Sequence, residues 1–184
     1  IERQNVEAES VHQVRYEPTS NAAYAVGTLV PRNMQTAMTK ALAALSARVG
    51  NIDEYVASKL GYTVDQVNGT QENPGFFSAE QMDALALAID NVESGAGFII
   101  GDQTGVGKGR VVAGVLRYAL LAGRVPVFVT KDPGLYGDMV RDLRDIGMAD
   151  AHTRIFVSNN DLRGTDAVPL SDEDGDALSS LSNL

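Results

Sequence analysis

The chain has 184 residues, of which 44% are hydrophobic and 21% are charged, and its formal net charge is −9. This composition is ordinary for a globular protein, and no apolar run approaches the roughly 18 residues that span a bilayer, so we expect no membrane association. The negative charge argues against strong non-specific DNA binding by this piece, because such binding relies on lysine and arginine. The sequence contains no cysteine, which excludes disulfides and thiolate metal sites and favours a reducing, cytoplasmic location.

The N-terminal segment shows no clear helical or strand period. It starts at Ile1 and not at methionine, so we expect a processed, trimmed or partial product. The run ERQNVEAES that follows is charged and polar, unlike a signal peptide. Residues 1–30 are therefore predicted to form an extended arm.

A small helical module is predicted over residues 31–70. Apolar residues at helical spacing follow Asn33, the expected N-cap of a first helix, and end before Gly50. A second short helix is predicted between Asn51, as its N-cap, and Gly61, and the segment TVDQVN adds one more turn.

A loop and a further helix come next. The segment GTQENPG is rich in turn-forming residues and predicts a loop. The helix predicted after it starts at Ser78 as its N-cap and carries one apolar face, formed by Met82, Leu85, Ala86, Ile89 and Val92.

From residue 97 onwards the predicted elements alternate between strands and helices. Short apolar strands are predicted in GFIIGD, VPVFVT and RIFVS, and helices in KGRVVAGVLRYALLAG and PGLYGDMVRDLRDIG. This alternation predicts an α/β fold in which a parallel sheet is flanked by helices. Residues 161–184 are acidic and rich in serine, which predicts a flexible tail.

A glycine-rich loop joins the first of these strands to its helix. In GDQTGVGKGR, Gly107 and Lys108 fit the phosphate-loop signature G-x-x-x-x-G-K-[ST], whereas Asp102 replaces the first glycine and Gly109 the final hydroxyl residue. A strand-to-helix junction offers unpaired backbone N–H groups and the positive end of a helix dipole to a phosphate. Residues 71–160 are therefore predicted to form the N-terminal portion of a P-loop NTPase.

Most of the expected phosphate contacts come from the backbone of this loop. Gly105 and Gly107 let the chain on either side of Val106 wrap an anion in conformations that a side chain would forbid. Lys108 supplies the point charge for the β and γ phosphates and is the candidate catalytic residue.

The neighbouring side chains leave alternatives open. Thr104 either donates to a phosphate or caps the local backbone, Asp102 is expected to brace the loop, and Arg110 either reaches a phosphate or is solvated. Gly109 lacks the hydroxyl that normally ligates Mg²⁺. Either the metal is held by phosphates, water and a carboxylate elsewhere, or hydrolysis is impaired. The sequence alone identifies no metal ligand.

The segment GFIIGDQTGVGKGRVVAGVLRYALLAGRVPVFVT, followed by DMVRDLRDIG, resembles the N-terminal helicase-like domain of the strawberry notch family. These proteins are superfamily 2 NTPases with bacterial, phage and eukaryotic members, and their loop reads G-D-x-x-G-V-G-K-G-R, so Gly109 follows the family's own pattern. The resemblance is strongest over residues 76–147. It implies a partial RecA-like parallel sheet, ATP and Mg²⁺ as cofactors, and nucleic acid as a partner of the complete protein.

Two further sites gain roles from the resemblance. Helicases of this superfamily place a glutamine upstream of the loop to pair with the adenine edge, and Gln81 occupies that place, although Ser78 and Gln81 also fit a helix capping box. Thr130 and Lys131 follow the second predicted strand, where such helicases contact the nucleic-acid backbone. Arg141 alternates with acidic residues on the next helix and reads mainly as part of a solvated, salt-bridged face.

The sequence lacks a recognisable acidic pair at the end of an apolar strand, which ATP hydrolysis by this machinery requires. Its acidic cluster at 172–176 reads as a solvated tail, and neither an arginine finger nor a second helicase lobe is found. We therefore expect the nucleotide-binding front portion of a helicase-like ATPase, acting with the remainder of the helicase or with other phage or bacterial proteins. By itself this chain is expected to hydrolyse ATP poorly, and whether it is an enzyme stays open.

The alternative is a processed phage structural or interaction protein, cytoplasmic or virion-associated, that retains the loop without turnover. A small-molecule kinase is disfavoured because no acceptor-binding segment is found.

Overall fold

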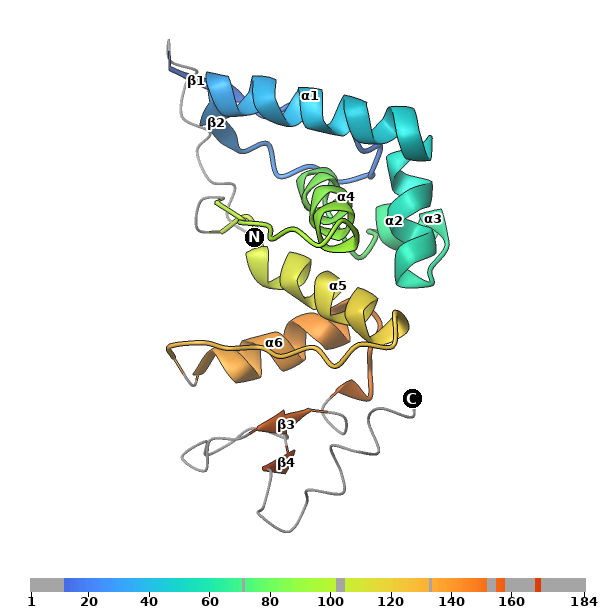
Figure 1. The fold of residues 1–184 in the computed structure, drawn as a ribbon, viewed down its shortest axis with the longest axis vertical. Coiled ribbons are helices and arrows are strands. Elements are labelled where there is room, and N and C mark those ends of the chain that lie inside the picture. Colours follow the sequence, from blue (N-terminus) through green and yellow to red (C-terminus); the bar gives the residue numbers. More distant parts are fainter. Residues whose placement is uncertain are drawn as a thin grey trace.

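The computed structural model describes residues 12–70, 72–101, 105–132, 134–151, 155–157 and 168–169. The secondary-structure elements in chain order are β1 (Gln13–Arg15), β2 (Leu29–Pro31), α1 (Arg32–Val49), α2 (Ile52–Leu60), α3 (Val64–Asn68), α4 (Ala79–Glu93), α5 (Lys108–Leu121), α6 (Gly134–Asp145), β3 (Phe156–Val157) and β4 (Val168–Pro169). The helices form successive layers, from α1 through α4 and α5 to α6, with α2 and α3 at one side (Figure 1). No helix in these ranges is long and apolar enough to cross a membrane.

The helix boundaries follow their capping residues in most cases. The Asn51 side chain accepts from the Glu54 N–H at the start of α2, and Gly61 ends that helix with a φ of 66°. Gly50 follows α1 with a φ of 83°. These three predicted boundaries are confirmed.

The predicted N-cap of α1 is wrong. The N-cap is Pro31, with φ −56° and ψ 137°, and no side chain caps this helix. Proline has a fixed φ that suits entry into a helix, so the chain turns into α1 before it reaches Asn33. The Asn33 side chain instead accepts a hydrogen bond from the N–H of the next residue, Met34, at 3.0 Å.

The predicted three-stranded parallel sheet is not formed among the described residues. The segments 96–101 and 124–130 have no assigned strand, and the parallel pairing that is present joins the two-residue strands β3 and β4. A second, antiparallel pair joins β1 in the predicted arm to β2, which crosses from the arm into the predicted helical module at Pro31. The protein is therefore α/β but mostly helical.

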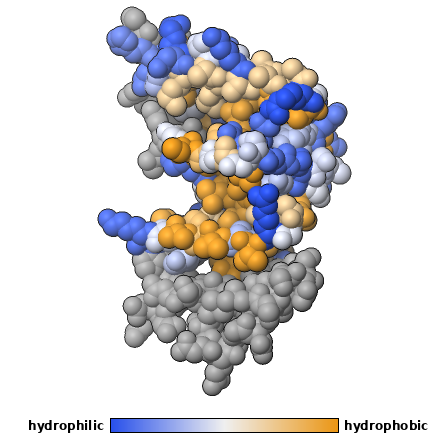
Figure 2. Space-filling view, viewed as in Figure 1, coloured by the Kyte–Doolittle hydropathy of each residue, from blue (hydrophilic) through white to orange (hydrophobic). Residues whose placement is uncertain are grey.

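The two apolar segments keep the side-chain alternation of strands, although neither is assigned as a strand. Phe98, Ile100 and Phe128 pack against the core, whereas Ile99 is 90% exposed and Val127 is 78% exposed. The segment 124–130 runs across α6 in Figure 1 and exposes hydrophobic side chains on the face seen in Figure 2. The exposure of these side chains follows the predicted alternation, but a strand also needs a partner for its backbone groups.

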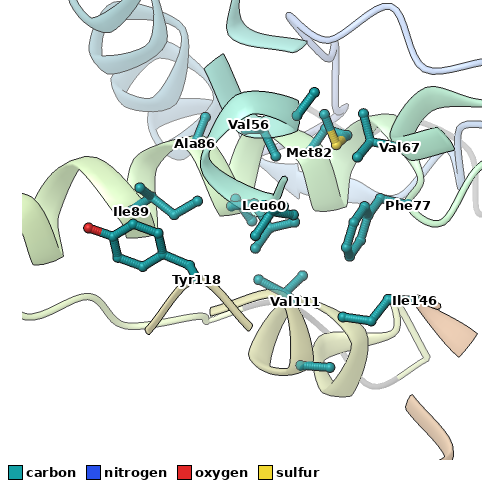
Figure 3. Close-up of a cluster of buried hydrophobic side chains, with 14 of the residues drawn as sticks. Val56, Leu60, Val67, Phe77, Met82, Ala86, Ile89, Val111, Tyr118 and Ile146 are labelled. Atoms are coloured by element: carbon teal, nitrogen blue, oxygen red, sulfur yellow. The ribbon is translucent and has the colours of Figure 1, made fainter. Parts of the chain in front are cut away.

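One hydrophobic core joins the helical module to the region around the loop. Figure 3 shows side chains from several layers pointing toward one another. They include Leu60 from α2, Met82 from α4, Val111 from α5 and Ile146 just after α6, each at most 1% exposed. Because these side chains share one cluster, the position of α5 depends on helices on both sides of it.

Buried carboxylates hold the N-terminal arm against this core. Asp83 on α4 and Asp53 on α2 are 0% and 3% exposed, and Glu80 on α4 is 6% exposed. Their hydrogen-bond donors are the hydroxyls of Tyr16 and Ser20 and the backbone N–H groups of Thr19, Ser20, Asn21, Val26 and Gly27. Burial raises the pKa of Asp83 although its three donors oppose the shift.

Candidate functional site

The described part of the glycine-rich loop has the backbone shape that the sequence predicts. Gly105 and Gly107 have φ values of 98° and 80°, in the left-handed region that favours glycine. Gly107 is the N-cap of α5, and Lys108 is the first residue of that helix. Gly107 has no side chain with which to cap the helix, and its carbonyl accepts from the Arg110 N–H at 3.0 Å. The start of α5 thus has the N–H groups and the dipole direction that suit an anion.

Gln81 braces this loop through its side-chain amide. Its nitrogen donates to the backbone carbonyls of Val106 at 2.9 Å and Gly107 at 3.2 Å, while its oxygen accepts from the Ser78 N–H at 3.0 Å. The capping box with Ser78 is therefore formed. The adenine role of Gln81 stays a prediction, and in this structure the amide is engaged by the protein's own backbone.

Arg110 ties the start of α5 to two other segments. Its guanidinium donates to the Phe76 carbonyl at 3.2 Å and pairs with Asp145 on α6 at 2.8 Å. The guanidinium therefore binds two protein partners and is not simply solvated. The predicted contact of Arg110 with a phosphate stays a prediction. The side chain instead connects the loop's helix to the segment before α4 and to α6.

Gly109, the position where a strict signature has a hydroxyl residue, lies against a carboxylate. A β-carbon placed on Gly109 would be far inside van der Waals contact with Oδ2 of Asp142 and 3.2 Å from its Cγ. The other oxygen of Asp142, Oδ1, accepts a hydrogen bond from Arg141 at 3.2 Å, which raises the pKa of that guanidinium. A larger residue at position 109 would therefore require the Asp142 carboxylate to move.

Thr130 and Lys131 lie in the turn that leads into α6. The Thr130 hydroxyl accepts from the Asp132 N–H at 3.3 Å, and the Asp132 side chain accepts from the Gly134 N–H at 2.9 Å. Lys131 is exposed. Their predicted contact with nucleic acid stays a prediction.

Other predicted residues are placed as follows. Asp102 and Thr104 lie outside the described residues, as does the acidic cluster at 172–176. Arg141 pairs with Asp138 at 2.7 Å and with Asp142 at 3.2 Å, which confirms the predicted salt-bridged face. Among the ranges that the structure describes, no group of three or more histidine or acidic side chains is placed to hold a metal ion.

The acidic residues of α6 are the part of the site that sequence reasoning missed. Asp142 and Asp145 alternate with arginines along the sequence and so belong to the predicted salt-bridged face of this helix. The structure keeps the pair of Asp142 with Arg141, and in addition it brings Asp142 to Gly109 and pairs Asp145 with Arg110. The sequence signal that could have linked α6 to the loop is that GDQTGVGKGR and RDLRDIG both resemble segments of the same family.

The residues present fit a nucleotide phosphate with its magnesium. The helix start provides backbone donors, Lys108 provides positive charge, and Asp142 provides a carboxylate beside the loop. Mg²⁺ in such sites is commonly bound by one or two carboxylates together with substrate phosphates and water. The glycine-rich loop at the start of α5 is thus typical of the class of P-loop nucleotide-binding proteins.

Comparison with known proteins places the chain within this class. Residues 51–172, more than half of the chain, match the family described as P-loop containing NTP hydrolase pore-1, and the chain belongs to this family. It is 42% identical over 80 residues to Protein strawberry notch homolog 1 of Gallus gallus, covering 40% of this chain and 6% of that protein. It is also 39% identical over 82 residues to Protein strawberry notch of Drosophila melanogaster, covering 41% of this chain and 5% of that protein.

A third relative, Protein strawberry notch homolog 2 of Homo sapiens, is 46% identical over 79 residues, which cover 39% of this chain and 6% of that protein. The predicted resemblance to the N-terminal P-loop domain of the strawberry notch family is confirmed. The matched segment spans only about a twentieth of these relatives. No solved structure matches the chain significantly.

Proposed function

We propose that this chain is the nucleotide-binding front portion of a helicase-like ATPase of superfamily 2. The observation that carries the proposal is the loop at the start of α5, where two glycines with positive φ precede Lys108 at a helix N-terminus without a side-chain cap. Such a terminus binds anions through its N–H groups and its dipole. Membership of a family of NTP hydrolases supports the same conclusion.

In this proposal the loop backbone around Gly105 and Gly107 holds the phosphates, and the Lys108 ammonium stabilises the negative charge on the γ phosphate. Asp102, Thr104 and Arg110 are further candidates for residues that bind or surround the phosphates. When bound, Mg²⁺ would neutralise part of the phosphate charge. The exposed strand-like segments 96–101 and 124–130 would become strands of a RecA-like sheet in a longer protein that supplies their neighbours.

We also propose that the complete protein acts on nucleic acid, with Thr130 and Lys131 contacting its backbone. This part rests on the family resemblance and on the exposure of Lys131 at the start of α6. The helix that follows holds three aspartates and two arginines, which gives it no excess of positive charge, so any contact would be local to this turn. Hydrolysis is expected to need the remainder of the protein, which would supply the acidic pair and the second lobe.

Nucleotide-dependent thermal stability tests the proposal. A ligand that binds only the folded chain stabilises it by about 2.7 kcal/mol at a concentration of about one hundred times Kd, so ATP and ADP should raise the melting temperature. Lys108→Ala should remove most of this rise, whereas Lys40→Ala, which removes an exposed lysine of α1, should leave it unchanged. A melting temperature that does not respond to either nucleotide would contradict the proposal and favour a structural or interaction protein.

A further inference from the structure

The carboxylate of Asp142 occupies the space beside Gly109 where a strict phosphate loop would carry its hydroxyl side chain. A β-carbon on Gly109 would collide with Oδ2 of Asp142. The Asp142 side chain is 15% exposed, so it lies largely inside the contact between α5 and α6. The loop therefore has an oxygen next to position 109, but it comes from α6 and not from the loop.

We propose that Asp142 supplies to the Mg²⁺ of a bound nucleotide the protein oxygen that residue 109 cannot supply. This inference rests on the proposed nucleotide binding at the loop. A carboxylate oxygen is a hard, negatively charged ligand of the kind that Mg²⁺ prefers. The glycine at position 109 is then part of the metal site, because it leaves the carboxylate room to approach the start of α5.

The other acidic residues of α6 are placed differently. Asp145 is paired with Arg110 at 2.8 Å, and Asp138 is paired with Arg141 with about half of its side chain exposed. Arg141 also contacts Asp142 through Oδ1, but the Arg141 side chain is 61% exposed, so its guanidinium can turn to water when a metal ion binds the carboxylate. Asp142 is thus the carboxylate of this helix that faces the loop.

A carboxylate in this place has opposite effects with and without metal. Without metal, its negative charge lies near the phosphates and weakens nucleotide binding by repulsion. When Mg²⁺ lies between the carboxylate and the phosphates, the carboxylate attracts the metal ion and so strengthens the binding of the metal–nucleotide complex. The proposal therefore predicts an affinity for nucleotide that depends strongly on Mg²⁺ and that loses this dependence when the charge of Asp142 is removed.

The test compares the binding of a fluorescent ADP analogue in Mg²⁺ and in EDTA for three chains. The wild type should bind more tightly in Mg²⁺. Asp142→Asn should reduce this metal-dependent gain at least about tenfold, the lower end of what removing a group near a metal costs, and should bind at least as tightly as the wild type in EDTA. Asp138→Asn removes a charge from the same helix and should behave like the wild type in both conditions.

Two further measurements make the result specific. Electron paramagnetic resonance of Mn²⁺ with ADP should report bound metal in the wild type and in Asp138→Asn, and much less in Asp142→Asn. The double variant Gly109→Ser and Asp142→Ala exchanges the carboxylate for a loop hydroxyl and should regain part of the metal-dependent gain. This double variant also tests the proposal if Asp142→Asn does not fold.

The outcomes separate this inference from the proposed function. An unchanged metal-dependent gain in Asp142→Asn would overturn the inference and leave nucleotide binding standing. A loss of affinity by the same factor in Mg²⁺ and in EDTA would also overturn it, because it would indicate that Asp142 only supports the loop. If the wild type binds no nucleotide in either condition, both proposals fail.

Discussion

The side-chain nitrogen of Gln81 donates to the Gly107 carbonyl at 3.2 Å, so the first turn of α4 holds the turn that begins α5. The same amide closes the capping box with Ser78. A β-carbon on Gly107 would collide with this nitrogen. The loop's shape is thus set jointly by glycine conformation and by a contact from a helix 26 residues earlier in the chain.

Replacing Gln81 by leucine should weaken the loop as a phosphate site. Leucine fills a similar volume but cannot donate to Val106 and Gly107. The carbonyl of the buried Val106 would lose this donor at a cost of about 1–3 kcal/mol. We expect lower affinity for ATP, GTP and inorganic triphosphate, measured by competition with a fluorescent nucleotide. An additional loss for ATP alone would indicate an adenine contact. Unchanged affinity for triphosphate would contradict the bracing role.

The contact between Gly109 and Asp142 should appear as coupling in a double-mutant cycle. Gly109→Ala should destabilise the wild type by about 1 kcal/mol, since the new methyl group overpacks against the carboxylate. In an Asp142→Ala background the same change should stabilise the chain by up to about 1 kcal/mol, because alanine favours helices over glycine. Chemical denaturation measures both. Equal effects in the two backgrounds would mean that the residues do not touch.

Asp83→Asn should loosen the N-terminal arm. The carboxylate accepts from the Tyr16 hydroxyl and from the Thr19 and Ser20 N–H groups. In asparagine, one carboxylate oxygen is replaced by an NH2 group, which would face one of these hydrogen-bond donors and could not accept from it. We expect the free energy of unfolding to fall by about 3 kcal/mol and protease cleavage near residue 19 to accelerate. Glu72→Gln, at an exposed acidic residue, is the control and should change neither. Unaltered cleavage in Asp83→Asn would contradict the role of the carboxylate.

Glu93 should make stability depend on acid pH. The hydrogen bond from Lys59 lowers the pKa of Glu93 below its ordinary value of 4.5, with help from the Tyr55 and Tyr118 hydroxyls. A lowered folded-state pKa contributes stability that is present above 4.5 and is lost as the pH falls through the folded value. Glu93→Gln should therefore lower stability by about 1 kcal/mol at neutral pH, as expected for a partly exposed pair. This difference from the wild type should shrink as the pH falls below 4.5.

Thermal melts at neutral and acid pH measure this difference. Asp138→Asn is the control, because its carboxylate pairs with Arg141 on the exposed side of α6. A difference between Glu93→Gln and the wild type that stayed constant with pH would exclude the ionic contribution.

The apolar segment 124–130 offers a matched pair of substitutions. Val127 is 78% exposed, whereas Phe128 packs against the core and lies edge-on to the Tyr136 ring at 5.9 Å. Val127→Thr should change stability by less than about 0.5 kcal/mol, and Phe128→Ala should cost about 2 kcal/mol, less than for a fully buried ring. Denaturation curves of this chain test the pair. Comparable losses in both variants would show that Val127 is covered in solution.

Local interactions explain why the helices were predictable. Asn51, Gly61 and Ser78 mark their helix ends because each acts within a few residues of itself, through a side-chain cap or a left-handed backbone. The loop glycines belong to the same group, since a positive φ is a property of single residues. The start of α1 was missed because a proline immediately upstream supplied the turn into the helix.

By itself, the sequence determined the helices, the phosphate loop and the family, because periodicity, caps and glycine positions act over short distances along the chain. Tertiary structure decided which groups meet. It placed Asp142 beside Gly109, Gln81 beneath the loop, and the arm on the buried Asp83. It also left the described segments 96–101 and 124–130 without strand assignment. The apolar pattern of a strand is local, whereas its hydrogen bonds require a neighbour that this pattern does not specify.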